Sequence, residues 1–188
     1  MKTVAIEEYG QLFTSIIGKG IFLTTTDGIK PDTMTISWGE MGVVWGAPSV
    51  TVMVRKSRYT HGNLDKVKAF TLSIPLDESM KKALAYCGSN SAFNVDKFAN
   101  TDLKIVASQT GTVPVVGSDA SYPSSHPAVG GDGSVSAKAP FLYLECIVQY
   151  EQDMDVAALA DEARIKFYPD EDIHTFYVGK ISAAYMEK

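Results

Sequence analysis

Six consecutive residues of this sequence can all donate hydrogen bonds: Arg55, Lys56, Ser57, Arg58, Tyr59 and Thr60. Arginine presents a planar fork that matches the oxygens of a phosphate, and hydroxyl groups and a helix N-terminus supply further donors. We interpret this run as the binding site for the phosphate of a cofactor. The alternative is a charged strand end followed by a helix that Ser57 caps.

A second group of polar side chains lies upstream, in Pro31–Trp38. The alternation predicts a strand with two unlike faces, with Met34, Ile36 and Trp38 on one and Thr33, Thr35 and Ser37 on the other. An exposed strand face usually carries Lys or Glu. Three short hydroxyl side chains indicate that something packs there and needs hydrogen bonds. The alternative is a plain Thr-rich exposed face.

The remaining candidates are single residues. Lys97 is either another anion contact or a solvated charge. His174 stands at the start of a predicted strand, where a lone histidine is more often structural or solvated than catalytic. We find no Ser/His/Asp order typical of a hydrolase, no HExxH motif and no zinc-binding cysteine pattern. The sequence therefore predicts no metal site.

The charge balance limits the partners. The formal net charge is -5, so a generic nucleic-acid or anionic-membrane surface is not expected. The cationic run at 55–58 is a local exception, which one small anion explains better than a polyanion. Neither a signal peptide nor an apolar stretch of about 18 residues is visible, and the two cysteines favour buried reduced thiols. We therefore expect a cytoplasmic protein.

The elements that must position these residues are mostly strands, and we expect one domain over residues 1–188. The pattern predicts strands at Ile21–Thr26, Pro31–Trp38, Val50–Arg55, Ala69–Pro75, Phe141–Tyr150 and Ile173–Met186. Asp27-Gly28 signals a hairpin, and a further piece of sheet is expected to end at Pro48. Helices are predicted near Val4–Gly18 and at Arg58–Lys68, Glu78–Tyr86 and Asp155–Arg164, with Met80, Ala83, Leu84 and Cys87 facing inward. So few helices fit a compact barrel better than a doubly wound sheet.

The stretch Ala107–Ala139 interrupts this pattern. It is rich in Gly, Ser and Pro and nearly free of charge. A long run of this kind is usually functional or mobile. We interpret it as an excursion that forms a lid or a dimer contact.

Several motifs together resemble the flavin reductase-like family, in particular its flavoredoxin-type FMN-binding proteins. They are TMTISWGEMGVVW, PSVTVMVRKSRYT, AFTLSIP, YCGSNS with DKFA, and HTFYVGKI, in this order. The resemblance implies a mainly β fold, a six-stranded antiparallel Greek-key split barrel with flanking helices. It also implies a homodimer with noncovalent FMN near the dimer interface.

The resemblance assigns the site residue by residue. Arg55, Ser57, Arg58 and Thr60, with the adjacent Tyr59, match the phosphate-binding segment, and Lys97 matches a further cofactor contact. Thr35, Ser37 and Trp38 match the strand beside the isoalloxazine ring, where hydroxyl groups such as Thr33 and Thr35 could serve the pyrimidine edge. Ser89, Asn90 and Ser91 match a loop along the flavin. His174 matches a position near the nicotinamide side, which is the weakest of these assignments.

The implied function is an FMN-dependent oxidoreductase. It moves hydride or electrons between NAD(P)H or a redox partner and an acceptor. The alternatives are a flavin-binding or electron-carrier module without direct NAD(P)H turnover, and a split-barrel relative that has lost its ligand.

Overall fold

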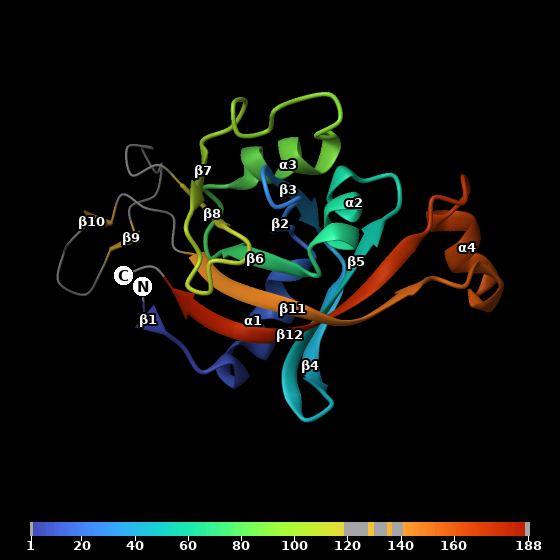
Figure 1. Cartoon of the computed structure of the whole chain (residues 1–188), viewed down its shortest axis with the longest axis horizontal. Helices are drawn as coiled ribbons and strands as arrows, with labels where there is room; N and C mark the ends of the chain where they lie inside the picture. The colour runs from blue at the N-terminus through green and yellow to red at the C-terminus, as the bar shows by residue number, and fades with distance from the viewer. Residues whose placement is uncertain (1, 119–127, 130–134, 137–140, 187–188) are drawn as a thin grey trace.

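The computed structural model describes residues 2–118, 128–129, 135–136 and 141–186 (Figure 1). Within them, one sheet of antiparallel strands runs in the order β3-β2-β6-β11-β12-β5-β4, with β1 added to β12. The strands are β1 Lys2–Thr3, β2 Ile21–Thr26, β3 Pro31–Ile36, β4 Gly39–Val44, β5 Ala47–Arg55, β6 Ala69–Pro75, β11 Phe141–Asp153 and β12 His174–Met186. The sheet curls so that β3 also contacts β5. The expected mainly β split barrel with flanking helices is confirmed.

The strands form where side chains alternate or are apolar throughout. Val50, Val52 and Val54 of β5 are fully buried, whereas Met53 and Arg55 point to the opposite face, as predicted. All of β2 and β6 is buried, and Asp27-Gly28 forms the expected turn between β2 and β3. In β12, His174 pairs with Arg55 of β5. This register brings two candidate site residues side by side.

Helices cover the barrel at three places. A short 3-10 turn, η1 (Ile6–Tyr9), leads into α1 (Gly10–Ile17), which packs against β4. Helix α2 (Tyr59–Lys66) contacts β2, β3 and β5, and α3 (Lys81–Ser89) lies over β3. The inward residues predicted for the α3 region are all buried: Met80, Ala83, Leu84 and Cys87. No helix in these described ranges is long and apolar enough to cross a membrane.

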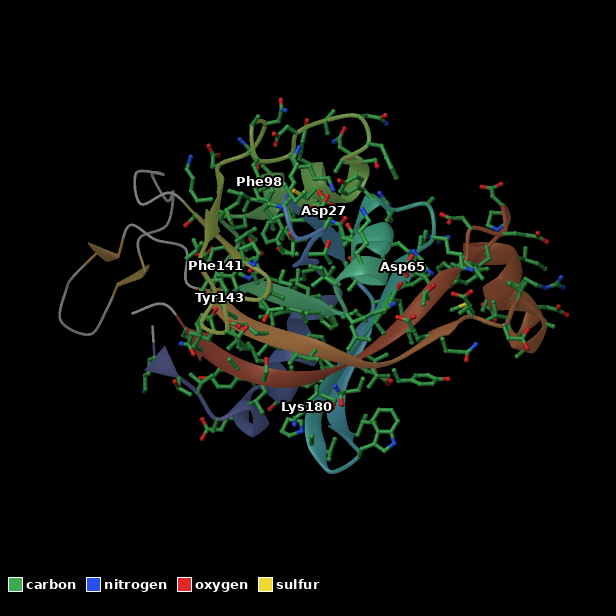
Figure 2. All side chains as sticks on the ribbon, in the orientation of Figure 1. Asp27, Asp65, Phe98, Phe141, Tyr143 and Lys180 are labelled. Carbon is green, nitrogen blue, oxygen red and sulfur yellow. The ribbon has the colours of Figure 1, made fainter. Side chains whose placement is uncertain are left out.

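A second core lies beside the barrel. Phe141 and Tyr143 stack with 5.6 Å between their ring centroids, on the side of the sheet that β7 (Leu103–Val106) and β8 (Val115–Ser118) cover (Figure 2). The buried carboxylate of Glu145 accepts the backbone N–H groups of Gln109 and Thr110 at 2.6 and 2.9 Å. The start of the predicted excursion is therefore anchored to β11.

The rest of that excursion is described only at β9 (Ala128–Val129) and β10 (Val135–Ser136), which pair with each other. The lid or dimer contact suggested for 107–139 stays a prediction, because 119–127, 130–134 and 137–139 lie outside the described residues.

Several predicted element boundaries are wrong. The helix expected at Glu78–Tyr86 runs over Lys81–Ser89, and the strand expected at Pro31–Trp38 ends at Ile36. Pro48 lies inside β5, close to its start, where a proline is tolerated, and the sheet continues past it. The single helix expected at Asp155–Arg164 is split into η2 (Val156–Ala158) and α4 (Asp161–Phe167). Asp155 caps η2 by accepting the N–H of Ala157, and the backbone is extended at 159–160 before α4 begins. Helix α4 lies at the end of the long β11–β12 arm (Figure 1).

Candidate functional site

A pocket of about 200 Å³ lies where β3 and β5 end and β12 begins, and we call it the aromatic pocket. Its lining residues are Met34, Thr35, Ile36, Ser37, Trp38, Met53, Arg55, Arg58 and His174. Trp38 follows β3, which is an edge strand of the sheet, and the alternation of β5 turns Met53 and Arg55 toward this side. A tryptophan, two methionines and two arginines give the pocket apolar walls with cationic groups.

Three aromatic rings meet at the wall of the aromatic pocket. The ring centroid of Trp38 lies 5.3 Å from that of His174 and 5.1 Å from that of Phe167, which approaches edge-on. The Nδ1 atom of His174 is 2.8 Å from the hydroxyl of Tyr168. Burial, with the nearby Arg55 charge, lowers the pKa of His174 to about 4. The imidazole is therefore neutral near pH 7.

The donors of the cationic run do not share one ligand site. The guanidinium of Arg55 donates to the carbonyl of Phe167 at 2.9 Å and to the carbonyl of Asp172. Ser57 donates to the Asp172 carboxylate with its hydroxyl at 2.7 Å and its N–H at 3.2 Å. Arg55 and Ser57, both predicted to bind a phosphate, are thus occupied by the segment that returns from α4.

Arg58 differs from these two residues. It is half-buried and lines the aromatic pocket, and its guanidinium has no partner among the described residues. It is also the N-cap residue of α2, without a side-chain capping bond, so the suggested cap at Ser57 is wrong. The partial positive charge of the α2 N-terminus adds to the Arg58 charge at this point.

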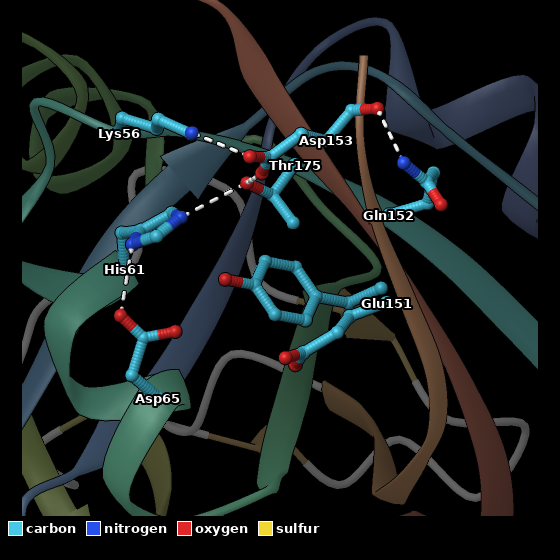
Figure 3. A pocket seen from close by; sticks show the side chains of 8 residues that line it. Lys56, His61, Asp65, Glu151, Gln152, Asp153 and Thr175 are labelled. Atoms are coloured by element: carbon cyan, nitrogen blue, oxygen red, sulfur yellow. Dashed lines mark hydrogen bonds and ion pairs between the residues drawn. The ribbon is translucent and has the colours of Figure 1, made fainter.

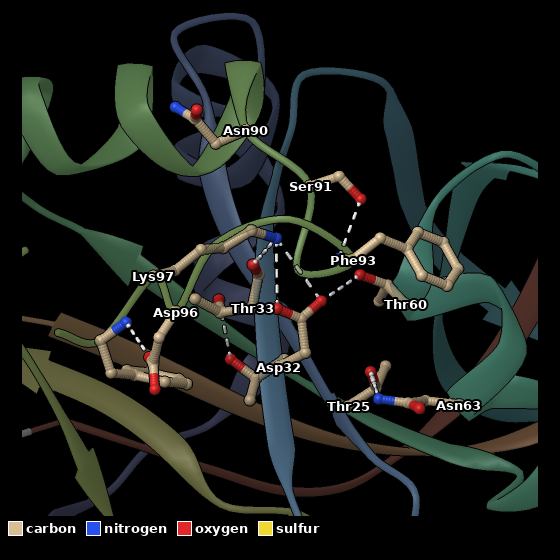
Figure 4. A network of polar contacts seen from close by, with 12 residues as sticks. Thr25, Asp32, Thr33, Thr60, Asn63, Asn90, Ser91, Phe93, Asp96 and Lys97 are labelled. Carbon is tan, nitrogen blue, oxygen red and sulfur yellow. Dashed lines mark hydrogen bonds and ion pairs between the residues drawn. The ribbon is translucent and has the colours of Figure 1, made fainter. Parts of the chain in front are cut away.

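A buried polar network joins α2 to β3 and to the segment that carries Lys97 (Figure 4). The ammonium of Lys97 donates to the carbonyl of Thr33 at 2.6 Å and to the Asp32 carboxylate at 3.2 Å. Thr60 donates its hydroxyl to the same carboxylate at 2.8 Å. Lys97 is 3% and Asp32 4% exposed, so the interpretation of Lys97 as a solvated charge is wrong. Asp32 was not predicted, because in the sequence it is only a lone acid in a Thr-rich strand.

The hydroxyl face of β3 is used by the protein itself. Thr33 is buried within 3.1 Å of the Thr24 hydroxyl, and Thr35 donates to the carbonyl of Leu84 in α3 at 2.7 Å. The prediction that something packs on this face is therefore confirmed. The suggestion that Thr33 serves a flavin edge is wrong, because its hydroxyl lies in the interior.

The other predicted residues lie outside the aromatic pocket. Ser89 and Asn90 bond to carbonyls of α3, and the Ser91 hydroxyl accepts the N–H of Phe93. Tyr59 packs edge-on against Phe93, with 5.1 Å between centroids. The structure brings together Thr35, Ser37, Trp38, Arg55, Arg58 and His174, but the lining excludes Ser57, Tyr59, Thr60, Ser89, Asn90, Ser91 and Lys97. Sequence reasoning missed Met53 as a pocket residue, although the alternation of β5 that predicted the face of Arg55 also predicts the face of Met53.

A larger pocket of about 370 Å³, the polar pocket, lies on the other face of β12 (Figure 3). Its lining residues are Lys56, His61, Asp65, Glu151, Gln152, Asp153, Thr175 and Tyr177. Most of them pair with one another: Lys56 with Asp153 at 2.5 Å, and His61 with Thr175 at 2.9 Å. These contacts fix α2 to the β11–β12 arm. In the described ranges, no group of three or more His, Cys, Asp or Glu side chains could hold a metal ion.

Comparison with known proteins gives one family. A family model described as the flavin reductase like domain matches residues 14–188. No curated protein matches significantly.

Solved structures share the fold at low sequence identity. A flavoredoxin of Desulfovibrio vulgaris (Miyazaki F) is 20% identical, with a TM-score of 0.59 over 90% of this chain and 69% of that one. A flavoredoxin from Methanosarcina acetivorans is 23% identical, with a TM-score of 0.57 over 90% and 68%. The Streptomyces globisporus C-1027 NADH:FAD oxidoreductase, in complex with NAD and FAD fragments, is 20% identical, with a TM-score of 0.56 over 98% and 86%.

Proposed function

The chain belongs to the flavin reductase-like family, and on this premise we propose that it binds FMN noncovalently and works as an oxidoreductase. FMN, when bound, would accept hydride or electrons from NAD(P)H or a redox partner and pass them on. The observation that carries the proposal is Arg58: a half-buried arginine without a partner among the described residues, at the rim of a pocket walled by Trp38 and Met53.

The donor set fits a flat ring with an anionic tail. The aromatic pocket holds about 200 Å³, below the roughly 300 Å³ at which small-molecule pockets usually begin. We therefore assign it the ring end of the cofactor, with the phosphate outside it at Arg58. Trp38 and Met53 would pack against the ring, and Thr35 and Ser37 lie on the strand beside it. His174, being neutral, would add no charge to this wall.

In this proposal, some residues of the cationic run contact the cofactor directly and others act through their neighbours. Arg58 and the α2 N-terminus would bind the phosphate directly. Tyr59 and Thr60 would act indirectly, because the Tyr59 ring packs on Phe93 and the Thr60 hydroxyl donates to Asp32. Arg55 would contribute its charge at the pocket wall, and Ser57 and Lys97 would act through the residues that they hold. The loop Ser89–Ser91 would reach the cofactor only by moving from its present contacts.

Phosphate binding is tested by titrating FMN into the protein and into Arg58→Ala. One charge-assisted contact is worth about 1.5–3 kcal/mol, so affinity should fall about 10- to 150-fold. Arg164→Ala is the matched control, because among the described residues the Arg164 guanidinium bonds only to Asp161, on the exposed face of α4. Equal affinity of Arg58→Ala and the parent would move the phosphate elsewhere. Failure of the pure protein to bind FMN after reconstitution would reject the proposal itself.

An electron carrier is the second candidate, because two of the similar solved structures are flavoredoxins. Anaerobic addition of NADH or NADPH to the FMN-loaded protein separates the two functions. Bleaching of the flavin absorbance requires direct hydride transfer and supports the reductase. An unchanged spectrum with either nucleotide supports the carrier or another non-catalytic flavin-binding module.

We also propose a cytoplasmic homodimer. Val43, Trp45 and Tyr150 form an exposed apolar group, with the Trp45 and Tyr150 rings 6.4 Å apart, which favours contact with a second copy. Cys87 and Cys146 are both buried and free, in keeping with a reducing compartment. Sedimentation velocity of the parent and of Trp45→Glu tests the dimer, and a monomeric parent would refute it.

A further inference from the structure

The segment 154–173 leaves the sheet after β11 and returns to it at β12. Neither η2 nor α4 has a buried residue and Ile165 is largely exposed, although Met154 and Tyr168 at the two sides of these helices are buried. Polar contacts therefore add to a small apolar anchor in holding the returning chain in place. The chain ends its return at Asp172, two residues before His174 of the aromatic pocket.

Asp172 is the centre of these contacts. Its two carboxylate oxygens accept the N–H and the hydroxyl of Ser57 at 3.2 and 2.7 Å. Arg55 donates to the backbone carbonyl of Asp172, and its guanidinium lies 3.9 Å from the same carboxylate. Arg55 also bonds to the carbonyl of Phe167 and lies over the Tyr168 ring, 5.1 Å from its centroid. We call Arg55, Ser57 and Asp172 the latch.

The backbone next to the latch is strained. Glu171 has a φ of 55°, a left-handed conformation that a residue with a Cβ adopts at a cost. Such a conformation persists only where the surroundings enforce it. Asp172 is the next residue in the chain. Its bonds to Ser57 and Arg55 help to hold Glu171 in this conformation.

The held segment reaches the wall of the aromatic pocket at two points. Phe167 meets the Trp38 ring edge-on, and Tyr168 bonds to His174. Trp38 and His174 both line the pocket, whereas Asp172 does not. A continuous set of contacts therefore runs from the latch to the side chains that we assign to the flavin ring.

We propose that Asp172 is a positioning residue for the ring side of the site, acting through Arg55 and Ser57. The inference rests on the proposed function for its flavin, but the latch itself exists in the protein without a ligand. The residues of the cationic run then have two roles. Arg58 binds the phosphate, while Arg55 and Ser57 hold the wall of the aromatic pocket against which the flavin ring is placed.

The first experiment needs no cofactor. Trp38 and Trp45 are the only tryptophans, so Trp45→Phe leaves Trp38 as the sole reporter. In that background, Asp172→Asn and Ser57→Ala should raise the acrylamide quenching of Trp38, by up to about twofold because this side chain is already 37% exposed. Asp170→Asn is the matched control, since it removes the same charge two residues away at an exposed position, and it should leave quenching unchanged. Quenching equal to the parent in both latch variants would overturn the proposal, with circular dichroism verifying that they are folded.

The second experiment uses the FMN-loaded protein. Asp172→Asn should shift the visible absorption band and the reduction potential of the flavin, while the affinity for FMN changes less than about threefold. The control variant Asp170→Asn should change none of these three quantities. A tenfold gain in FMN affinity would overturn the positioning role, because it would mean that the Asp172 carboxylate competes with the phosphate for Ser57. If FMN fails to bind the parent, the proposed function fails and the Trp38 quenching still decides the latch.

Discussion

Replacing Asp32 by Asn tests the buried network that supports the N-terminus of α2. The carboxylate of Asp32 is 4% exposed and lies 3.2 Å from the ammonium of Lys97, which is 3% exposed. Removing one partner of such a pair leaves the other charge buried without compensation, which costs about 3–5 kcal/mol. The Asn carbonyl can still accept from Thr60 or Lys97, so we expect the lower end, about 3 kcal/mol.

The assay is urea unfolding followed by circular dichroism. A loss of about 3 kcal/mol leaves a domain of ordinary stability folded, so the variant remains measurable. Asp96→Asn is the control, because Asp96 and its partner Lys30 are 50% and 59% exposed at 3.9 Å, where a pair contributes about 0–1 kcal/mol. The Asn oxygen can also keep the bonds that Asp96 accepts from Phe98 and Ala99.

A second variant isolates the cause of the loss. Adding Lys97→Met to Asp32→Asn removes the uncompensated charge and should restore part of the lost unfolding free energy. The reasoning is refuted if Asp32→Asn costs less than about 1 kcal/mol, as a surface pair would, or if the double variant is less stable than Asp32→Asn.

Two further predictions concern packing and pH. Gly179→Ala would place a Cβ 2.6 Å from a ring carbon of Phe70, so it should lower the free energy of unfolding by about 1–3 kcal/mol or more. Gly42→Ala is the control and should cost far less, because its Cβ would have no atom within 4 Å. Equal melting temperatures of the two variants would contradict this prediction. His174 has a pKa lowered to about 4, so the unfolded chain takes up its proton first as the pH falls below about 6.5. The protein should therefore lose about 2 kcal/mol of unfolding free energy between pH 7 and pH 5, and His174→Gln should not; equal losses would exclude His174 as the cause.

The strands could be predicted from the sequence because their pattern is local. Alternation alone separates the buried valines of β5 from Arg55, and runs rich in β-branched and aromatic residues account for β2 and β6. The split of the last helix depends on one capping bond at Asp155, which a pattern of charges at helix ends does not reveal. The pairing of Asp32 with Lys97 joins residues 65 positions apart and has no local signature.

The candidate site could likewise be predicted only in part, because local sequence does not show which distant residue each side chain contacts. Six adjacent donors predict an anion, but donor type alone does not say which acceptor takes each of them. Arg55 and Ser57 find theirs in Asp172, more than 100 residues away in the sequence, whereas Arg58 finds none among the described residues. Arg58 is half-buried, and within the described part of the chain its guanidinium has no bond to another side chain or carbonyl to give up before it binds a ligand. Our proposal therefore places the phosphate at Arg58, whereas Arg55 and Ser57 are engaged by Asp172 of the protein itself.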